Sequence, residues 1–130
     1  MIAGGAIGWR SKLQSFVSLS TTEAEFVAAV EAGKKIMWMC NILSEIGYAC
    51  TTASLLHIDN KSALCVTNNP EHHGRMKQLD LSYFWLREKV EAGVISTLHV
   101  PGTEQIADIL TKPLPMPKAQ WCTKAMGVVL

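Results

Sequence analysis

One long helix is the feature that most constrains how this chain can fold. The run Ser20-Thr21-Thr22-Glu23 has the form of a capping box, with Ser20 as the N-cap and the Glu23 side chain reaching back to the Ser20 amide. A helix is therefore predicted from here to about Ile46, where Gly47 offers a C-terminal stop. Residues at helical spacing give it one broad apolar face for core packing, made of Phe26, Ala29, Val30, Gly33, Ile36, Met37, Cys40 and Leu43.

Shorter patterns around this helix alternate between strand and helix. Apolar runs bounded by Gly, Pro and Asn divide the rest of the chain into segments of ordinary length for such elements. Together they predict an α/β layered fold. The expected order is strand, helix, strand, helix, helix, strand, helix, over residues 6–20, 20–46, 54–59, 60–68, 76–92, 94–100 and 104–112, with room for one more helix near Trp121.

Composition narrows the class of protein. With 130 residues, 48% of them hydrophobic and 18% charged, the chain has the size and make-up of one globular domain. No apolar run approaches the roughly 20 residues of a membrane span, and the N-terminus lacks the basic start of a secretory signal. The four cysteines show no Cys-x-x-Cys spacing, so we expect scattered buried thiols in an intracellular, reducing setting. The net charge of +1 does not indicate a nucleic-acid-binding protein, because such proteins usually carry a clear excess of basic residues.

Three carboxylates stand where chemistry is expected. Glu25 lies early in the long helix and leans towards its buried side, Asp59 ends a buried strand, and Asp108 is flanked by apolar residues in a late helix. Carboxylates that lean inward from separate elements repel one another unless a cation lies between them. Mg²⁺ is the natural candidate, because it takes hard oxygen ligands. A structural alternative is equally open: Asp59 could cap the helix that begins near Ser62, and Glu25 could favour a helix dipole.

Several motifs carry a resemblance that covers residues 9–115. The block Ser20-Thr21-Thr22-Glu23-Ala24-Glu25-Phe26, the strand end Ile58-Asp59-Asn60-Lys61-Ser62-Ala63, and the run from Gln105 to Pro115 with its Thr-Lys-Pro-Leu-Pro ending resemble the ribonuclease H domain of Ty1/copia-type retrotransposon polyproteins. The last block and the first are highly specific in combination. The resemblance implies a ribonuclease H-like mixed sheet flanked by helices.

The resemblance also implies an activity and its residues. Such a domain is a metal-dependent endonuclease that cuts the RNA strand of RNA–DNA hybrids during reverse transcription, with two Mg²⁺ (or Mn²⁺) ions as cofactors. By motif, Glu25, Asp59 and Asp108 match three of the family's four acidic ligands. The hybrid is the expected partner, with the upstream reverse transcriptase domain of the same polyprotein, and the expected location is cytoplasmic. Candidate contacts to the hybrid are Asn60, Ser62, Arg75 and Lys77. His99, nine residues before Asp108, either lies near this site or packs in a strand.

The sequence departs from the family at its start. The family's first Asp lies on a strand upstream of the segment that begins at Trp9, and none of the eight residues before Trp9 is acidic. We therefore expect an N-terminally truncated domain over residues 1–115 that lacks the first strand and most of the second, followed by a tail over 116–130. The alternative function is a catalytically inactive remnant that keeps part of the fold without nuclease activity.

Overall fold

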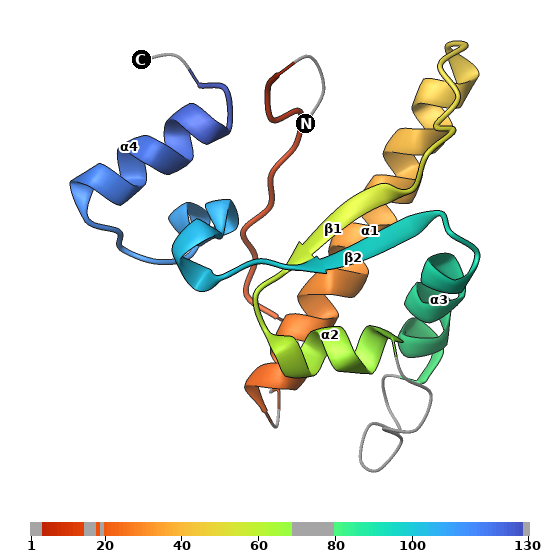
Figure 1. Cartoon of the computed structure of the whole chain (residues 1–130), viewed down its shortest axis with the longest axis horizontal. Coiled ribbons are helices and arrows are strands. Elements are labelled where there is room, and N and C mark those ends of the chain that lie inside the picture. Colours follow the sequence, from red (N-terminus) through yellow and green to blue (C-terminus); the bar gives the residue numbers. More distant parts are fainter. Residues whose placement is uncertain (1–3, 15–17, 19, 69–79, 129–130) are drawn as a thin grey trace. The chain divides into compact units, whose positions relative to one another are not determined.

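The computed structural model describes residues 4–14, 18, 20–68 and 80–128. Contacts divide the chain into two compact units, one of residues 16–100 and one that joins residues 1–15 to 101–130. The first unit holds α1 (Thr21–Glu45), β1 (Ser54–Ile58), α2 (Lys61–Asn68), α3 (Asp80–Glu91) and β2 (Ile95–His99) (Figure 1). The second holds two 3₁₀ helices, η1 (Gly102–Glu104) and η2 (Ile106–Leu110), and the helix α4 (Met116–Ala125). The predicted domain boundary after residue 115 stays a prediction.

The helix α1 begins and ends where the sequence predicts. The Ser20 side chain accepts a hydrogen bond of 3.1 Å from the Glu23 amide, which confirms Ser20 as the N-cap. At the other end Gly47 has φ of 88°, and the Tyr48 amide donates to the Leu43 carbonyl at 2.7 Å. This is the arrangement of a Schellman motif, and a glycine tolerates its left-handed residue without steric strain. The reciprocal bond from the Glu23 side chain to the Ser20 amide stays a prediction.

The described strands form one small parallel sheet. β1 pairs with β2 in the register Ser54 with Ile95 through Ile58 with His99, and the Val100 amide extends the ladder to the Ile58 carbonyl at 3.0 Å. Both strands lie within one residue or so of the ranges expected for them, 54–59 and 94–100. Parallel strands need a crossover connection, and here the crossover contains α2 and α3. Both strands therefore end at the same edge of the sheet.

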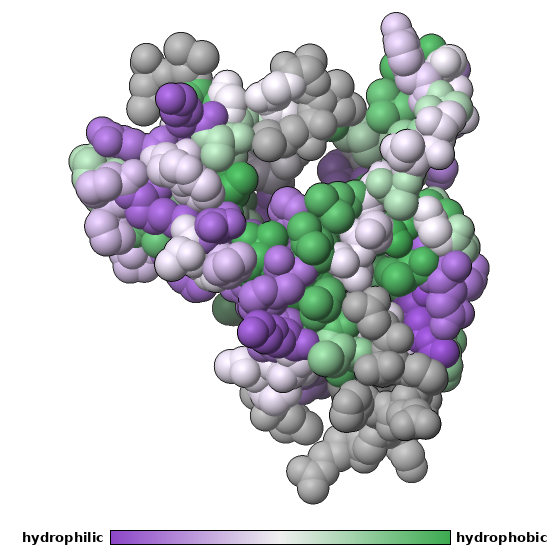
Figure 2. Space-filling model, viewed as in Figure 1, coloured by the Kyte–Doolittle hydropathy of each residue, from purple (hydrophilic) through white to green (hydrophobic). Residues whose placement is uncertain are grey.

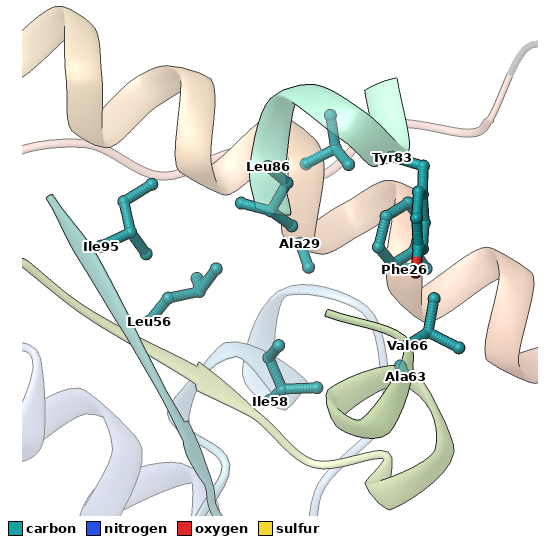
Figure 3. Close-up of a cluster of buried hydrophobic side chains, with 10 residues drawn as sticks. Phe26, Ala29, Leu56, Ile58, Ala63, Val66, Tyr83, Leu86 and Ile95 are labelled. Carbon is teal, nitrogen blue, oxygen red and sulfur yellow. The ribbon is translucent and has the colours of Figure 1, made fainter. Parts of the chain in front are cut away.

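A hydrophobic core lies between this sheet and the helices of its unit. Figure 3 shows Phe26 and Ala29 of α1 gathered with side chains from both strands and from α2 and α3. Gly33 allows the closest approach, because a Cβ there would lie 3.0 Å from Leu86 Cδ1 and 3.4 Å from Ile95 Cδ1. The core covers one face of the sheet, whereas Leu55 and Leu98 of the two strands are half exposed, and Figure 2 shows hydrophobic surface over the strands. The core residues are Phe26, Ala29, Val30, Leu56, Ile58, Ala63, Val66, Tyr83, Leu86 and Ile95.

Two predicted elements differ from the structure, and part of the first, residues 15–17 and 19, lies outside the described ranges. The described residues between 6 and 20 form no strand, since an extended segment becomes a strand only when a neighbouring strand supplies hydrogen bonds. The helix expected over 104–112 is instead η1 and η2, separated by Gln105 with φ of −73° and ψ of 107°, an extended conformation that interrupts helical hydrogen bonding. The predicted helix over 76–92 is confirmed as α3 from Asp80 onward, and its first four residues lie outside the described ranges.

The other unit is held by contacts between its two chain segments. The Ala6 amide donates to the Met126 carbonyl at 2.8 Å, and a Cβ on Gly127 would collide with the Gly4 carbonyl oxygen. Cys122 is fully buried, whereas Trp121 is partly exposed beneath the Lys118 ammonium, whose Nζ lies 3.9 Å from the ring centroid. The room for a tail helix near Trp121 is filled by α4. No helix in the described part of the chain is both long and apolar enough to cross a membrane.

Candidate carboxylate site

Asp59 lies at the carboxyl end of the parallel sheet. It follows directly on Ile58, the last residue of β1, and its side chain is half-buried. Within the described residues its carboxylate receives no hydrogen bond and no ion pair. A half-buried carboxylate without a protein partner is costly in water-poor surroundings unless a cation or water satisfies it. The carboxyl ends of parallel strands are also where α/β proteins commonly bind ligands.

His99 lies at the same edge of the sheet as Asp59. It is the last residue of β2 and lies opposite Ile58 in the register. Its Nε2 lies 3.1 Å from the main-chain carbonyl oxygen of Asp59, so a protonated Nε2 would donate to that oxygen. The two sequence-based readings of His99 are therefore compatible, because it packs at the end of a strand and lies beside the predicted site. Its contact ties the backbone of Asp59 to the neighbouring strand.

Asn60, not Asp59, caps α2. The Asn60 Oδ1 accepts from the Ser62 amide at 2.9 Å and from the Ala63 amide at 3.0 Å. This arrangement fills the capping role that was open to Asp59, so the structural alternative for Asp59 is wrong. Both hydrogen bonds use the Oδ1 atom of Asn60, so its Nδ2 group can still donate to a bound nucleic acid. The Ser62 side chain is exposed at the start of α2.

Glu25 stands near the start of α1 in the same unit as Asp59. It is the fifth residue of the helix and half-buried, and the acidic residue of the first turn is Glu23, which weakens the dipole alternative for Glu25. The neighbouring Phe26 is fully buried and shares the core with Ala63 of α2 (Figure 3). Because α2 begins two residues after Asp59, this packing brings the start of α1 and the end of β1 to the same region of the unit.

Asp108 has a different environment, in the unit that contains residues 101–130. It lies in η2, its side chain is 15% exposed, and its Oδ1 forms an ion pair of 2.8 Å with Lys112 Nζ. The Lys112 amide also donates to the Asp108 carbonyl at 2.8 Å. This carboxylate therefore already has a cationic partner. The i, i+4 spacing of an acid and a lysine is a signal by which the pair could have been found in the sequence.

The structure gives no position for the remaining predicted residues. Arg75 and Lys77 lie outside the described ranges. Among the residues that are described, no three or more His, Cys, Asp or Glu side chains are grouped so that they could hold a metal ion. Glu25 and Asp59 belong to one unit and Asp108 to the other, so their joint role as metal ligands stays a prediction.

Comparison with known proteins finds relatives that match most of this chain. It is 40% identical over 126 residues, 97% of its length, to the retrovirus-related Pol polyprotein from transposon TNT 1-94 of Nicotiana tabacum. The chain is homologous to a segment of retrotransposon Pol polyproteins. The Pol polyprotein from transposon RE2 of Arabidopsis thaliana is 35% identical over 95% of the chain, and the transposon Ty1-DR5 Gag-Pol polyprotein of Saccharomyces cerevisiae is 29% identical over 89%. These relatives support the predicted Ty1/copia-type kinship.

The Pol relatives are far longer than this chain. The matched segment makes up 9% of the tobacco polyprotein, 8% of the RE2 polyprotein and 7% of the yeast one. No protein-family model matches the chain, and no solved structure matches it. The matches therefore show that the chain is similar to a short segment of Pol polyproteins, and any activity of the chain has to be inferred from its own residues.

Proposed function

We propose that this chain contributes three carboxylates to a ribonuclease H-like domain of a Ty1/copia-type Pol polyprotein, which cuts the RNA strand of RNA–DNA hybrids. The observation that carries the proposal is the state of Asp59. In a chain similar to Pol polyproteins, this half-buried carboxylate directly follows a parallel strand and has no partner among the described residues. Its neighbour Asn60 performs the local structural task instead.

The donor set suits a hard divalent cation. Asp59 and Glu25 offer carboxylate oxygens, and Asp108 offers a third carboxylate if its ion pair with Lys112 breaks. When bound, Mg²⁺ or Mn²⁺ would activate a water and stabilise the leaving oxygen of the phosphodiester. The protein's own part is to hold the carboxylates: the core beneath Phe26 fixes the start of α1, and the His99 contact fixes the backbone of Asp59.

Contacts to the hybrid are proposed around the start of α2. The Nδ2 group of Asn60 and the exposed hydroxyl of Ser62 are hydrogen-bonding groups next to Asp59, and they suit phosphate oxygens or 2′-hydroxyls. Arg75 and Lys77 would add positive charge to the same interaction by resemblance. Because the chain has a net charge of only +1, we assign much of the affinity for nucleic acid to the upstream reverse transcriptase domain of the polyprotein, acting in the cytoplasm.

One observation favours a second candidate, an inactive ribonuclease H-like segment that binds without cutting. The ion pair between Asp108 and Lys112 neutralises one proposed ligand. A cation site that has to displace a lysine binds its ion more weakly than a site with free carboxylates. In this reading Lys112 replaces the metal and the segment keeps only a structural part in the polyprotein.

Cleavage of a labelled RNA–DNA hybrid tests the proposal. The chain is assayed alone and joined to the upstream Pol segment that, by resemblance, carries the family's first Asp, with Mg²⁺ or Mn²⁺. Asp59→Asn should lower the cleavage rate by about 100-fold or more, since loss of even an outer-shell partner of a metal ligand costs about 10–100-fold. The matched control is Glu45→Gln, which replaces an exposed carboxylate at the far end of α1 and should leave the rate unchanged. If the chain binds the hybrid but does not cut it, either alone or joined to the upstream segment, the inactive segment is favoured.

A further inference from the structure

Charge is divided unequally between the two compact units. The unit of residues 1–15 and 101–130 has five basic and two acidic residues, a net charge of +3, which leaves −2 for residues 16–100 in a chain of net charge +1. One of the two acids, Asp108, is already paired with Lys112. The nearly neutral total therefore conceals a basic unit. Its basic residues are Arg10, Lys12, Lys112, Lys118 and Lys124, and its acidic residues are Glu104 and Asp108.

The helix α4 arranges part of this charge around a tryptophan. Lys118, Trp121 and Lys124 follow one another at intervals of three residues, so they lie along one face of the helix. Residues 109–130 contain no aspartate or glutamate. Figure 2 shows mostly hydrophilic and pale surface over α4, which Figure 1 draws in blue. We call the row of Lys118, Trp121 and Lys124 the α4 stripe.

Cys122 fastens α4 within its unit from a different side of the helix. Its side chain is fully buried, so α4 has an inward side as well as the stripe. It is also the one cysteine that meets the expectation of buried thiols. That expectation is wrong for the other three, because Cys40 is half-buried and Cys50 and Cys65 are exposed.

Two contacts hold the lysine that lies over the Trp121 ring. Lys118 Nζ is 3.9 Å from the ring centroid, and the same ammonium donates a hydrogen bond to the Thr103 carbonyl oxygen of η1. A cation over the ring stabilises its orientation. Trp121 is nevertheless 43% exposed, so part of the ring remains accessible. Lys124 is exposed and pairs with none of the described residues, so its charge is available to an anion.

A similar pair on α1 lies in different electrostatic surroundings. Lys35 Nζ is 3.7 Å from the Trp38 ring centroid, and Trp38 is 50% exposed. On the same helix Lys34 forms an ion pair with Glu31, and the unit as a whole has a net negative charge. A lysine over an exposed tryptophan is thus common to both helices, whereas the surrounding positive charge belongs to α4.

We propose that the α4 stripe binds single-stranded nucleic acid, with Trp121 stacked on a base and the lysines beside the phosphates. Every base has a π face, so an exposed aromatic ring in a basic surface binds single strands with little sequence preference. Bases inside a duplex are covered by their neighbours, so the stripe should favour unpaired strands. Six residues of helix separate Lys118 from Lys124 by about 9 Å along the axis, which lets them reach different phosphates. This binding needs no metal ion and goes beyond the proposed nuclease site.

Fluorescence anisotropy of a labelled oligothymidylate tests this binding. The purified chain is titrated into a single strand of about 15 nucleotides and into a DNA duplex of the same length, both in EDTA, because single-strand sites span about 4–16 nucleotides. The single strand should bind about 5-fold or more tightly than the duplex, since only its bases are free to stack. Binding should weaken as salt rises, because lysine contacts release counterions. Failure to bind the single strand, or equal binding of both, would overturn the assignment.

Variants on the two helices separate base stacking from general attraction. Trp121→Ala should raise the Kd about 10-fold, whereas Trp121→Phe, which keeps an aromatic ring, should raise it about threefold or less. Lys124→Gln should reduce the slope of log Kd against log salt by about 0.7, the value for one phosphate contact on a single strand. The matched control is Trp38→Ala, which removes the tryptophan of the similar pair on α1 and should leave the Kd unchanged. Circular dichroism checks that each variant is folded.

The results of these variants are independent of cleavage. Equal losses from Trp121→Ala and Trp38→Ala, or a folded Trp121→Ala chain that binds as tightly as the unmodified one, would overturn the role of the α4 stripe. Asp59→Asn should leave oligothymidylate binding unchanged, because the carboxylate is no part of the stripe. Normal binding without hybrid cleavage would therefore count against the nuclease alone, and cleavage without this binding would count against the stripe alone.

Discussion

Asp59 and Asp108 are predicted for the same task, yet the two regions that carry them are built differently. Asp59 directly follows a strand whose alternate residues Leu56 and Ile58 are buried in the core of residues 16–100. Asp108 lies in a 3₁₀ helix with no buried residue of its own, and its carboxylate is held by Lys112. The first carboxylate is fixed through its backbone and has no partner within the described part of the chain, whereas the second is fixed through its partner.

The comparison shows that a carboxylate can be held in position with or without being neutralised. A strand anchored in a core places a carboxylate without neutralising it, so the group can accept a cation. A local ion pair neutralises the group and places it at the same time, so a cation has to compete with a lysine. In this comparison the strand end of Asp59 is the stronger candidate for the centre of a metal site, and Asp108 is a ligand that depends on rearrangement.

Loss of the core beneath the Asp59 strand should have the largest effect. Leu86 of α3 is fully buried, so Leu86→Ala leaves a cavity and should lower the free energy of unfolding by about 3 kcal/mol. Leu81→Ala on the same helix removes a side chain that is 87% exposed and serves as the matched control, with little change expected. Urea unfolding followed by circular dichroism measures both. Equal effects of the two substitutions would show that Asp59 does not rest on this core.

Overpacking at Gly33 should disturb the same region less severely. A Cβ at this position would lie 3.0 Å from Leu86 Cδ1 and 3.2 Å from Trp85 Cζ3, and valine adds two more carbons. Gly33→Val should therefore lower the free energy of unfolding by about 2 kcal/mol, measured by urea titration. Ala28→Val adds the same β-branched side chain to an exposed position of α1 and should cost about 0.5 kcal/mol. A Gly33→Val chain as stable as the Ala28→Val chain would refute the close approach of α1 and α3.

Adjacent residues at the strand end should respond in opposite ways. Asn60→Ala removes the acceptor of two amide hydrogen bonds and should cost about 1 kcal/mol of stability, whereas Asn60→Asp should retain the cap. Asp59→Asn removes a charge that pairs with none of the described residues, and should leave the stability unchanged or slightly higher. Thermal unfolding of the three variants decides the matter. Destabilisation by Asp59→Asn and not by Asn60→Ala would reverse the assigned roles.

Breaking the ion pair of Asp108 should have the smallest effect on stability. Lys112 is 56% exposed, so solvent screens much of its attraction to Asp108, and Lys112→Met should cost no more than about 0.5–1 kcal/mol. The cost should shrink further in high salt. Urea unfolding at low and at high salt measures it. A loss of several kcal/mol that salt does not reduce would show that the pair is structural, and would remove Asp108 from the candidate ligands.

Local signals in the sequence account for the elements that were predicted well. The cap at Ser20, the stop at Gly47 and the apolar face around Phe26 are readable from neighbours in the chain, and α1 follows them closely. The two strands are short apolar runs bounded by turn residues, and both appear within a residue or so of their expected ranges. The ends of the helix depend on interactions within a few residues, and the ends of the strands are marked by the turn residues beside them, so a single sequence contains both signals.

Other features depend on partners that are distant in the chain. Residues 6–14 have strand-like composition, but no strand in the described chain pairs with them. The extended backbone at Gln105 divides a segment with helical periodicity into two 3₁₀ helices. At the candidate site, the choice of Asn60 over Asp59 as the cap and the contact of His99 with the Asp59 carbonyl require the actual path of the backbone. Sequence patterns named the acidic residues, and only the fold distinguishes their environments.

Binding of Mn²⁺ followed by NMR tests the central claim most directly, because the paramagnetic ion broadens amide signals near its site. The account predicts that substoichiometric Mn²⁺ broadens the amides of Asp59, Asn60 and His99 first, that Asp59→Asn abolishes this broadening, and that Asp108→Asn weakens it less. Broadening that is unchanged in Asp59→Asn, or that centres on residues far from the end of β1, would contradict the assignment of this strand end as the metal site.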